Sequence, residues 1–230
     1  MMMSTIDAAW ARTMASLLLG AALVVATATL NRSTAQENKG AASVRIVAFG
    51  DSLTAGFELP PVAAFPAQLE KALKQRGHDV AVANAGVSGD TTSGGLQRLD
   101  WAVPEGTDAV ILELGANDAL RGVSPQTARA NLDAILTRLA ERKIAVLLAG
   151  MRSPRNWGKD YVDEFEKIYP ELANKHGALL YPFFMEGVAM QAEMVLDDGL
   201  HPNPGGVAKI VELILPHVET LIGRVDTAAN

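Results

Sequence analysis

The sequence predicts an α/β fold: a three-layer α/β/α sandwich around a five-stranded parallel sheet. Three observations support this prediction. From residue 44 onward, short apolar runs alternate with longer amphipathic ones. The short runs are continuously apolar, which is typical of strands buried on both faces. Alternating strands and helices favour parallel strands joined by right-handed helical crossovers.

The first half of this region supplies three strands and two helices. Helical spacing covers Phe65–Arg76 and stops at Gly77. The next helix runs to about Trp101, and Asp90 is its candidate N-cap. The predicted strands are short, apolar runs bounded by turn residues: Val44–Phe49, Val80–Ala85 and Ala109–Leu114.

The second half continues the alternation. A helix begins at Ser124 and runs to about Lys143, with Pro125 at the first helical position, where its missing N–H costs nothing. The remaining predicted elements are two strands and two helices: Ile144–Ala149, Lys159–His176, Ala178–Leu180 and Gly205–Ile222.

The first 35 residues differ in composition from the rest. Arg12 precedes a charge-free run from Met14 to Leu30, and a polar stretch follows. This pattern predicts a secretory signal peptide over residues 1–35, with candidate cleavage triplets at 26–28 and 33–35. The alternative is an uncleaved membrane anchor, for which the run is marginal in length. We therefore expect a periplasmic or secreted protein that contacts a membrane only if this segment is uncleaved.

Length and composition limit the remaining possibilities. A chain of 230 residues can bury one sizeable core. We expect a flexible linker to about residue 43, a single domain over 44–223 and a tail over 224–230, and a monomer is favoured. A formal charge of −6 without a basic stripe argues against a nucleic-acid partner. The absence of cysteine excludes disulfides and a thiol nucleophile.

Small or polar residues follow the first three predicted strands at similar offsets. They are Ser52 in GDSLTAG, Gly89 in NAGVSGD and Asn117 in GAND. Open α/β sheets bind ligands outside the carboxyl ends of their strands. If the three strands are neighbours, these residues converge on one spot. Taken alone, each is more often a turn or cap residue.

Together, the three residues fit acyl transfer. Ser52 would attack the acyl carbon. The backbone N–H groups of Ser52 and Gly89 and the side-chain amide of Asn117 would bind the oxyanion.

His201 is the candidate general base. It is one of four histidines and lies in a loop between the last strand and the last helix. Asp198 precedes it by three residues, with Gly199 permitting a tight turn. That spacing lets the carboxylate reach Nδ1 while Nε2 faces Ser52. Such a pattern is otherwise a solvated loop or half of a metal site, so a metal-assisted hydrolase using Asp197, Asp198 and His201 stays an alternative.

These segments resemble the SGNH, or GDSL, hydrolase family. Its four conserved blocks occur in order over residues 46–204, as Gly50–Leu53, Gly89, Asn117 and Asp198-x-x-His201. The resemblance implies a flavodoxin-like sandwich and neither a metal nor an organic cofactor. It also implies a triad of Ser52, Asp198 and His201 and an oxyanion hole formed by Ser52, Gly89 and Asn117.

Within the family, segments such as Leu112–Gly122 and Asp197–Asn203 resemble multifunctional bacterial thioesterases and lysophospholipases and the related periplasmic arylesterases. The resemblance implies a small-molecule ester or thioester substrate and an acyl groove formed partly by the loop Ala119–Ser124. Our candidates for groove lining are Leu120, Val123 and Trp157; Leu120 and Val123 would otherwise pack under the loop. Three arginines lie near the predicted mouth in sequence: Arg121, Arg152 and Arg155.

The sequence departs from the thioesterase pattern at two positions. Ala116 and Ala119 stand where glycine is common. Their methyl groups would narrow or stiffen the groove, which favours short acyl or aryl esters. Two other functions stay open: a carbohydrate O-acetylesterase with the same mechanism, and a catalytically silent binding module on the same scaffold.

Overall fold

The computed structural model describes residues 44–228. The predicted signal peptide or anchor and the predicted linker lie outside the described residues. The described part belongs to one compact unit.

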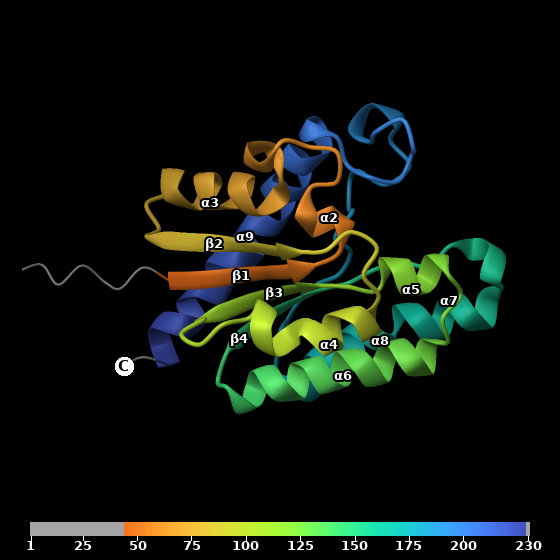
Figure 1. Ribbon diagram of the computed structural model, residues 1–230, viewed down its shortest axis with the longest axis horizontal. Helices are drawn as coiled ribbons and strands as arrows, with labels where there is room; N and C mark the ends of the chain where they lie inside the picture. Colours follow the sequence, from red (N-terminus) through yellow and green to blue (C-terminus); the bar gives the residue numbers. More distant parts are fainter. Residues whose placement is uncertain (1–43, 229–230) are drawn as a thin grey trace, which may run out of the picture. The chain divides into compact units, whose positions relative to one another are not determined.

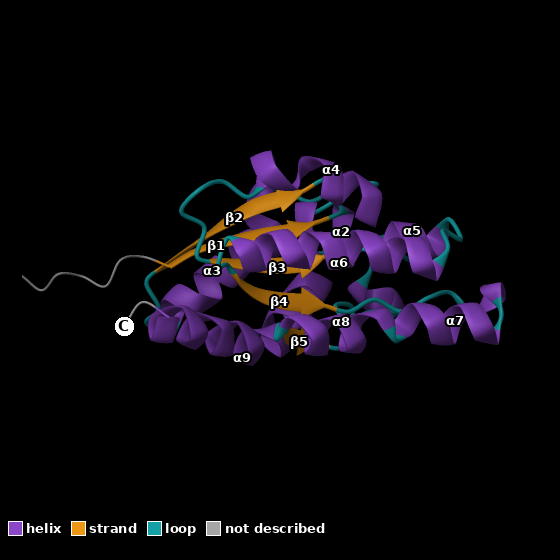
Figure 2. Cartoon of the chain, turned by 90° about the horizontal axis from the view of Figure 1, so that it is seen from below, coloured by secondary structure: helices purple, strands orange, loops and turns teal. Residues whose placement is uncertain are grey.

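The centre of this unit is a parallel sheet of five strands in the order β2-β1-β3-β4-β5 (Figure 2). The central strand β1 pairs with β2 on one side and β3 on the other, and its last residue, Gly50, lies opposite Gly86 and Glu113. The first three strands are therefore neighbours whose carboxyl ends are level, as the convergence of the site residues requires. The strands are β1 (Val44–Gly50), β2 (Val80–Gly86), β3 (Ala109–Glu113), β4 (Ala145–Ala149) and β5 (Leu179–Tyr181).

Helices cover both faces of the sheet, which confirms the three-layer prediction (Figure 1). One face carries α3 (Phe65–Gln75) and α9 (Pro204–Ala228). The other carries α4 (Thr92–Ala102), α6 (Pro125–Glu141) and α8 (Ile168–His176). The inner strands are largely buried from both sides, and every residue of β3 is buried, whereas the edge strand β2 is partly exposed.

Short helical segments at the carboxyl ends of the strands were absent from the sequence prediction. Two follow β1 and β3 directly: α2 (Ser52–Ala55) and α5 (Ala116–Leu120). Three single turns also occur: η1 (Pro61–Ala63), η2 (Arg155–Trp157) and η3 (Ala192–Met194). Patterns of four or five residues are too short to show helical periodicity.

Three predicted helix boundaries were wrong. Thr91, not Asp90, is the N-cap of α4, and its side chain accepts from the backbone N–H of Gly94. The predicted helix 159–176 is two helices, α7 (Lys159–Glu166) and α8, because Pro170 has no N–H to donate to the carbonyl of Glu166. The last helix continues to Ala228, so most of the predicted tail is helical.

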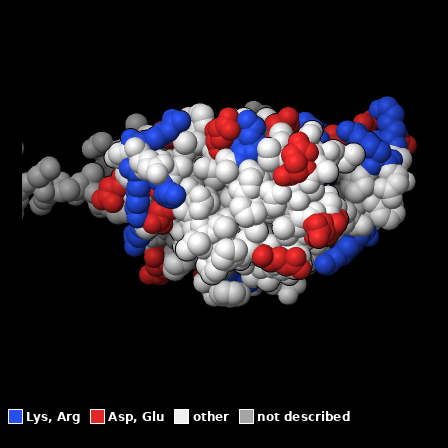
Figure 3. Space-filling view, turned by 90° about the horizontal axis from the view of Figure 1, so that it is seen from above, with Lys and Arg blue, Asp and Glu red and all other residues white. Residues whose placement is uncertain are grey.

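Within residues 44–228, the structure contains no helix with the length and apolar character needed to cross a membrane. On the side of the sheet that carries α3, basic and acidic side chains are interspersed around an uncharged area (Figure 3). This face offers no continuous basic surface for a polyphosphate backbone.

Candidate active site

Ser52 lies at the junction between β1 and the short helix α2. Asp51 caps this helix, because its Oδ1 accepts a hydrogen bond from the backbone N–H of Leu53 at 3.0 Å. Gly50 is required just before the cap, since a Cβ there would lie 2.2 Å from Oγ1 of Thr54. The sharp turn from strand to helix therefore presents Ser52 at the carboxyl edge of the sheet.

The structure brings Ser52, His201 and Asp198 into one chain of hydrogen bonds. Ser52 Oγ lies 2.9 Å from His201 Nε2, and His201 Nδ1 lies 2.5 Å from Asp198 Oδ2. The loop between Asp198 and His201 is a tight turn in which Gly199 has a φ of +70°. A serine, an imidazole and a carboxylate in this order are the arrangement that activates a hydroxyl nucleophile.

Two contacts hold the imidazole in place. Asp198 Oδ1 accepts the backbone N–H groups of Leu200 and His201 at 2.9 and 3.0 Å, which fixes the carboxylate. The hydrogen bond from the His201 ring and these two backbone bonds lower the pKa of Asp198 to about 2. The carboxylate is thus ionised at neutral pH and able to stabilise an imidazolium. On its face, the His201 ring contacts Phe57, with ring centroids 4.3 Å apart.

Gly89 lies in the loop after β2, and Asn117 lies on α5, directly after β3. Asn117 Nδ2 donates to Asp51 Oδ2 at 3.1 Å. A primary amide has two N–H bonds, so one is left for another acceptor. Within residues 44–228, the backbone N–H groups of Ser52 and Gly89 donate to no other protein group. Gly89 has a φ of +85°, a conformation that favours glycine.

A second carboxyl group lies behind Asp51. Glu113 is fully buried at the end of β3, and its Oε2 accepts from Thr54 Oγ1 at 2.7 Å and from the backbone N–H of Asp51 at 3.3 Å. Burial raises the pKa of Asp51 to about 6. Burial, followed by the charge of Asp51, raises the pKa of Glu113 well above its usual range. At neutral pH, Asp51 is therefore mostly ionised and carries the charge that Asn117 contacts.

The three predicted groove residues lie together beside α5. Leu120 and Trp157 are about half exposed, at 49% and 43%, and Val123 is half-buried. Trp157 Nε1 donates to the carbonyl of Ala119 at 2.8 Å, and its ring covers Gly122. Tyr161 donates to the carbonyl of Val123 at 2.7 Å. Two aromatic side chains thus fasten this loop to α7 and the turn before it.

The three predicted mouth arginines have separate partners. Arg121 Nη2 donates to the carbonyl of Gly89 at 2.9 Å. Arg152 lies over the ring of Phe183 and pairs with Glu186. Arg155 pairs with Glu166. Only Arg121 contacts a predicted oxyanion residue.

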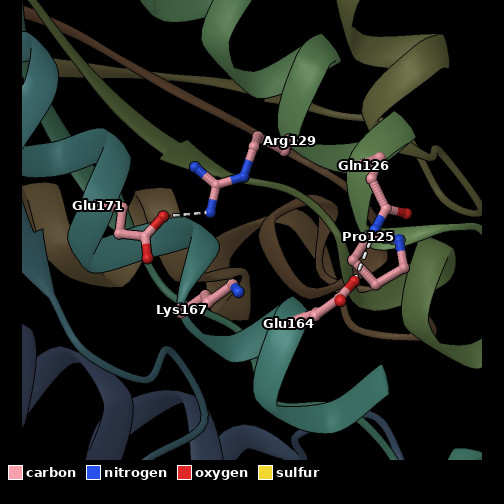
Figure 4. A pocket seen from close by; sticks show the side chains of 6 residues that line it. All are labelled: Pro125, Gln126, Arg129, Glu164, Lys167 and Glu171. Carbon is pink, nitrogen blue, oxygen red and sulfur yellow. Dashed lines mark hydrogen bonds and ion pairs between the residues drawn. The ribbon is translucent and has the colours of Figure 1, made fainter. Parts of the chain in front are cut away.

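Other polar clusters in the described residues lack the serine–histidine arrangement. His78 contacts Glu219, and His176 contacts Asp133. A cavity of about 300 Å³ lies beside α6, α7 and α8 (Figure 4), but its side chains form the pairs Arg129–Glu171 and Gln126–Glu164. Within residues 44–228, no group of three or more acidic or histidine side chains is arranged to hold a metal ion.

Sequence reasoning missed the side chains that support the site. Asp51, Phe57 and Arg98 contact the predicted site residues or the loops that carry them. Asp51 could have been found from its position beside Ser52. Phe57 and Arg98 give no sequence signal of their own.

Known proteins with similar sequences and structures support the same chemistry. Residues 48–209 match the GDSL-like lipase/acylhydrolase family. An arylesterase of Vibrio mimicus is 41% identical over 174 residues, which cover 75% of this chain and 87% of that protein. Thioesterase 1/protease 1/lysophospholipase L1 of Escherichia coli strain K12 is 36% identical over 187 residues, or 81% and 88% of the two chains.

A solved structure gives the same picture. The crystal structure of AlinE4, a SGNH-hydrolase family esterase, superposes with a TM-score of 0.67 at 46% identity. The match covers 78% of this chain and 97% of that one.

Proposed function

The chain belongs to the GDSL-like lipase/acylhydrolase family, and from this membership we propose that it hydrolyses carboxylic esters with Ser52 as nucleophile, His201 as general base and Asp198 as the orienting carboxylate. The observation that carries the proposal is the 2.9 Å contact between Ser52 Oγ and His201 Nε2. This contact places a proton acceptor, His201 Nε2, within hydrogen-bond distance of the Ser52 hydroxyl that attacks the ester.

The reaction has two halves. In the first, His201 Nε2 takes the Ser52 proton while Oγ attacks the acyl carbon, and the imidazolium then protonates the departing alcohol or thiol. This leaves an acyl-enzyme on Ser52. In the second, His201 removes a proton from water, the hydroxide attacks the acyl carbon, and the acid leaves as Oγ regains its proton. Asp198 stabilises the imidazolium in both halves.

The oxyanion is bound in this proposal by three N–H donors, from Ser52, Gly89 and Asn117. Each donor supplies roughly 3–4 kcal/mol to the transition state. The uncommitted N–H groups of Ser52 and Gly89 support the assignment. The charge of Asp51, which accepts one N–H of Asn117, supports the orientation of the amide.

For the substrate, we propose aryl and short-acyl esters over long-chain thioesters. Ala119 is 1% exposed, so its methyl group cannot narrow a groove. Instead, Ala116 and Ala119 stiffen α5, because alanine in a helix is about 1 kcal/mol more favourable than glycine. The contacts of Trp157 and Tyr161 add to this rigidity. A stiff loop resists the rearrangement that a long acyl chain needs.

An ester panel tests the substrate class. We expect kcat/KM for p-nitrophenyl acetate and butyrate to exceed the value for palmitoyl-CoA, and we expect the Ala119→Gly variant to reduce that preference. Comparable values for the short esters and palmitoyl-CoA would contradict it. Higher activity on acetylated polysaccharide than on any aryl ester would favour the carbohydrate O-acetylesterase instead.

A fluorophosphonate probe tests the nucleophile. The wild-type enzyme is expected to be labelled at Ser52, and Ser52→Ala is expected to lose the label. An unlabelled wild-type protein would favour the binding module. Full activity in a strong chelator is expected, whereas loss of activity there would favour the metal-assisted reaction of Asp197, Asp198 and His201.

We also propose that residues 1–35 direct export to the periplasm and are then removed. Their charge-free run from Met14 to Leu30 and the small residues after it support this. The mass of the protein recovered from a bacterial periplasm tests the proposal. A full-length mass in the membrane fraction would favour the anchor.

A further inference from the structure

A buried arginine joins the two loops that carry Ser52 and Gly89. Arg98 lies on α4 with 6% of its surface exposed. Its Nη2 donates to the carbonyl of Gly50 at 2.8 Å, its Nη1 to the carbonyl of Ala85 at 2.8 Å, and its Nε to Asp90 Oδ2 at 2.6 Å. The guanidinium carbon lies 4.2 Å from the centroid of the Phe49 ring. All of these groups lie at the carboxyl ends of β1 and β2 or in the loops that follow.

The three acceptors belong to the segments that hold two proposed oxyanion donors. Gly50 precedes Ser52 by two residues, and Asp90 directly follows Gly89. The loop between β2 and α4 is a tight turn in which the N–H of Asp90 donates to the carbonyl of Val87. Gly89 has no side chain to fix its position, so its N–H direction depends on the contacts of its neighbours.

We propose that Arg98 is a positioning residue: its guanidinium holds the backbone N–H of Gly89 at the distance and angle from Ser52 that the oxyanion requires. The inference rests on the proposed function and adds a residue that does not touch the substrate. A planar guanidinium donates in several fixed directions at once, which suits it to link two strand ends and a carboxylate.

The surroundings of Arg98 are built for this contact. Gly94, one turn before Arg98, leaves room for the carboxylate, because a Cβ there would lie 2.7 Å from Asp90 Oδ1. The carboxylate of Asp90 faces the buried guanidinium of Arg98, with Oδ2 and Nε 2.6 Å apart. The carbonyl of Gly89 is held from the other side by Arg121, which is exposed and therefore a weaker anchor.

The test compares Arg98→Lys with Arg142→Lys. Arg142 is a matched control: it also donates to two backbone carbonyls, those of Val103 and Pro104, but in the loop before β3. Lysine keeps the positive charge but lacks the planar guanidinium, which donates in several fixed directions. We expect kcat of Arg98→Lys to fall about 10- to 100-fold with KM within about 2-fold, by analogy with loss or displacement of an oxyanion donor. Arg142→Lys is expected to keep both constants.

A tetrahedral-adduct inhibitor supplies a readout that a merely structural role would not move. A trifluoromethyl ketone forms an oxyanion on Ser52, so its Ki should rise in Arg98→Lys by the same factor as kcat falls. If Arg98→Lys is folded and matches Arg142→Lys in kcat and in Ki, the proposal is wrong.

Asp90→Asn provides a second route if Arg98→Lys does not fold. This substitution keeps the hydrogen bonds of Arg98 to the carbonyls of Gly50 and Ala85. It weakens only the contact between Arg98 and residue 90, which directly follows Gly89. We expect a several-fold fall in kcat with a matching rise in Ki, and unchanged values would overturn the inference. A wild-type enzyme that neither hydrolyses aryl esters nor binds the ketone would instead refute the proposed function.

Discussion

Ser52 and His201 act as one unit in the proposed mechanism, because neither can move the proton alone. We expect Ser52→Ala and His201→Ala each to lower kcat by several orders of magnitude, and the double variant to be no worse than either single one. Steady-state hydrolysis of p-nitrophenyl acetate measures this. His176→Ala is the control, since His176 contacts Asp133 instead of a serine. If the fold-reductions in kcat of the two single variants multiply in the double variant, Ser52 and His201 act separately.

Asn117 is the side-chain donor of the proposed oxyanion hole. We expect Asn117→Ala to lower kcat about 10²- to 10³-fold with little change in KM. Asn117→Asp should be equally harmful, because a carboxylate would face Asp51 Oδ2 where an amide now donates at 3.1 Å. Rates for both variants on one aryl ester decide the matter. Near-normal turnover by either would mean that another group binds the oxyanion.

At the residue scale, the sequence indicates the proposed catalytic groups better than the side chains that support them. Ser52, Asn117 and His201 stand out because they occur in polar loops after apolar strands. Arg98 does not, because an arginine on an amphipathic helix is normally solvated. Its burial follows from a long-range contact: Asp90 and Gly50 are eight and 48 residues away.

At the element scale, short apolar runs predicted the five strands of the described sheet, and helical periodicity failed where single residues decide boundaries. Pro170 divides the predicted helix 159–176 into α7 and α8. Thr91 caps α4, whereas Asp90 pairs with Arg98. The short helix α2 could not be predicted, since its four residues form around the cap contact of Asp51.

The loop Ala119–Ser124, at the end of α5, is the subject of a prediction at the element scale. Trp157→Phe keeps a ring over Gly122 and removes the hydrogen bond to the carbonyl of Ala119. We expect about 1 kcal/mol less stability and a higher ratio of decanoate to acetate hydrolysis, because the loosened loop admits longer chains. Trp101→Phe is the control, since Trp101 is 72% exposed. An unchanged ratio in Trp157→Phe would show that the loop does not limit chain length.

At the scale of the whole molecule, strand–helix alternation was enough to predict three layers, but not the order of the strands. The order β2-β1-β3-β4-β5 places β1 and β3 at the point where the chain reverses its direction across the sheet. Ligands bind at such points in open α/β sheets. The candidate site therefore lies where topology alone would place it, and Gly89 is a candidate because β2 is the other neighbour of β1.

The buried carboxyl pair links stability to pH for the whole fold. The pKa of Asp51 is raised to about 6, above the ordinary aspartate value near 4 in the unfolded chain. Between these values the folded state binds more protons, so the free energy of unfolding falls as pH rises, by up to about 3 kcal/mol from Asp51. Glu113, whose pKa is also raised, adds to this fall. Asp198, whose pKa is lowered, acts oppositely, since its stabilisation is lost only as pH falls below about 4 toward 2.

Activity should follow the opposite trend, because the proposed mechanism needs an ionised Asp51 to hold Asn117. The Asp51→Asn variant separates the effect of Asp51 on stability from its effect on activity. Its side chain cannot titrate, so its advantage over the wild type in the free energy of unfolding should grow from pH 4.5 to pH 8. Its kcat should fall, since an amide nitrogen replaces the oxygen that accepts from Asn117. Urea denaturation at three pH values, alongside kcat, measures both effects. If the free energies of unfolding of the wild type and the variant fall equally with rising pH, the ionisation of Asp51 does not cause the loss of stability.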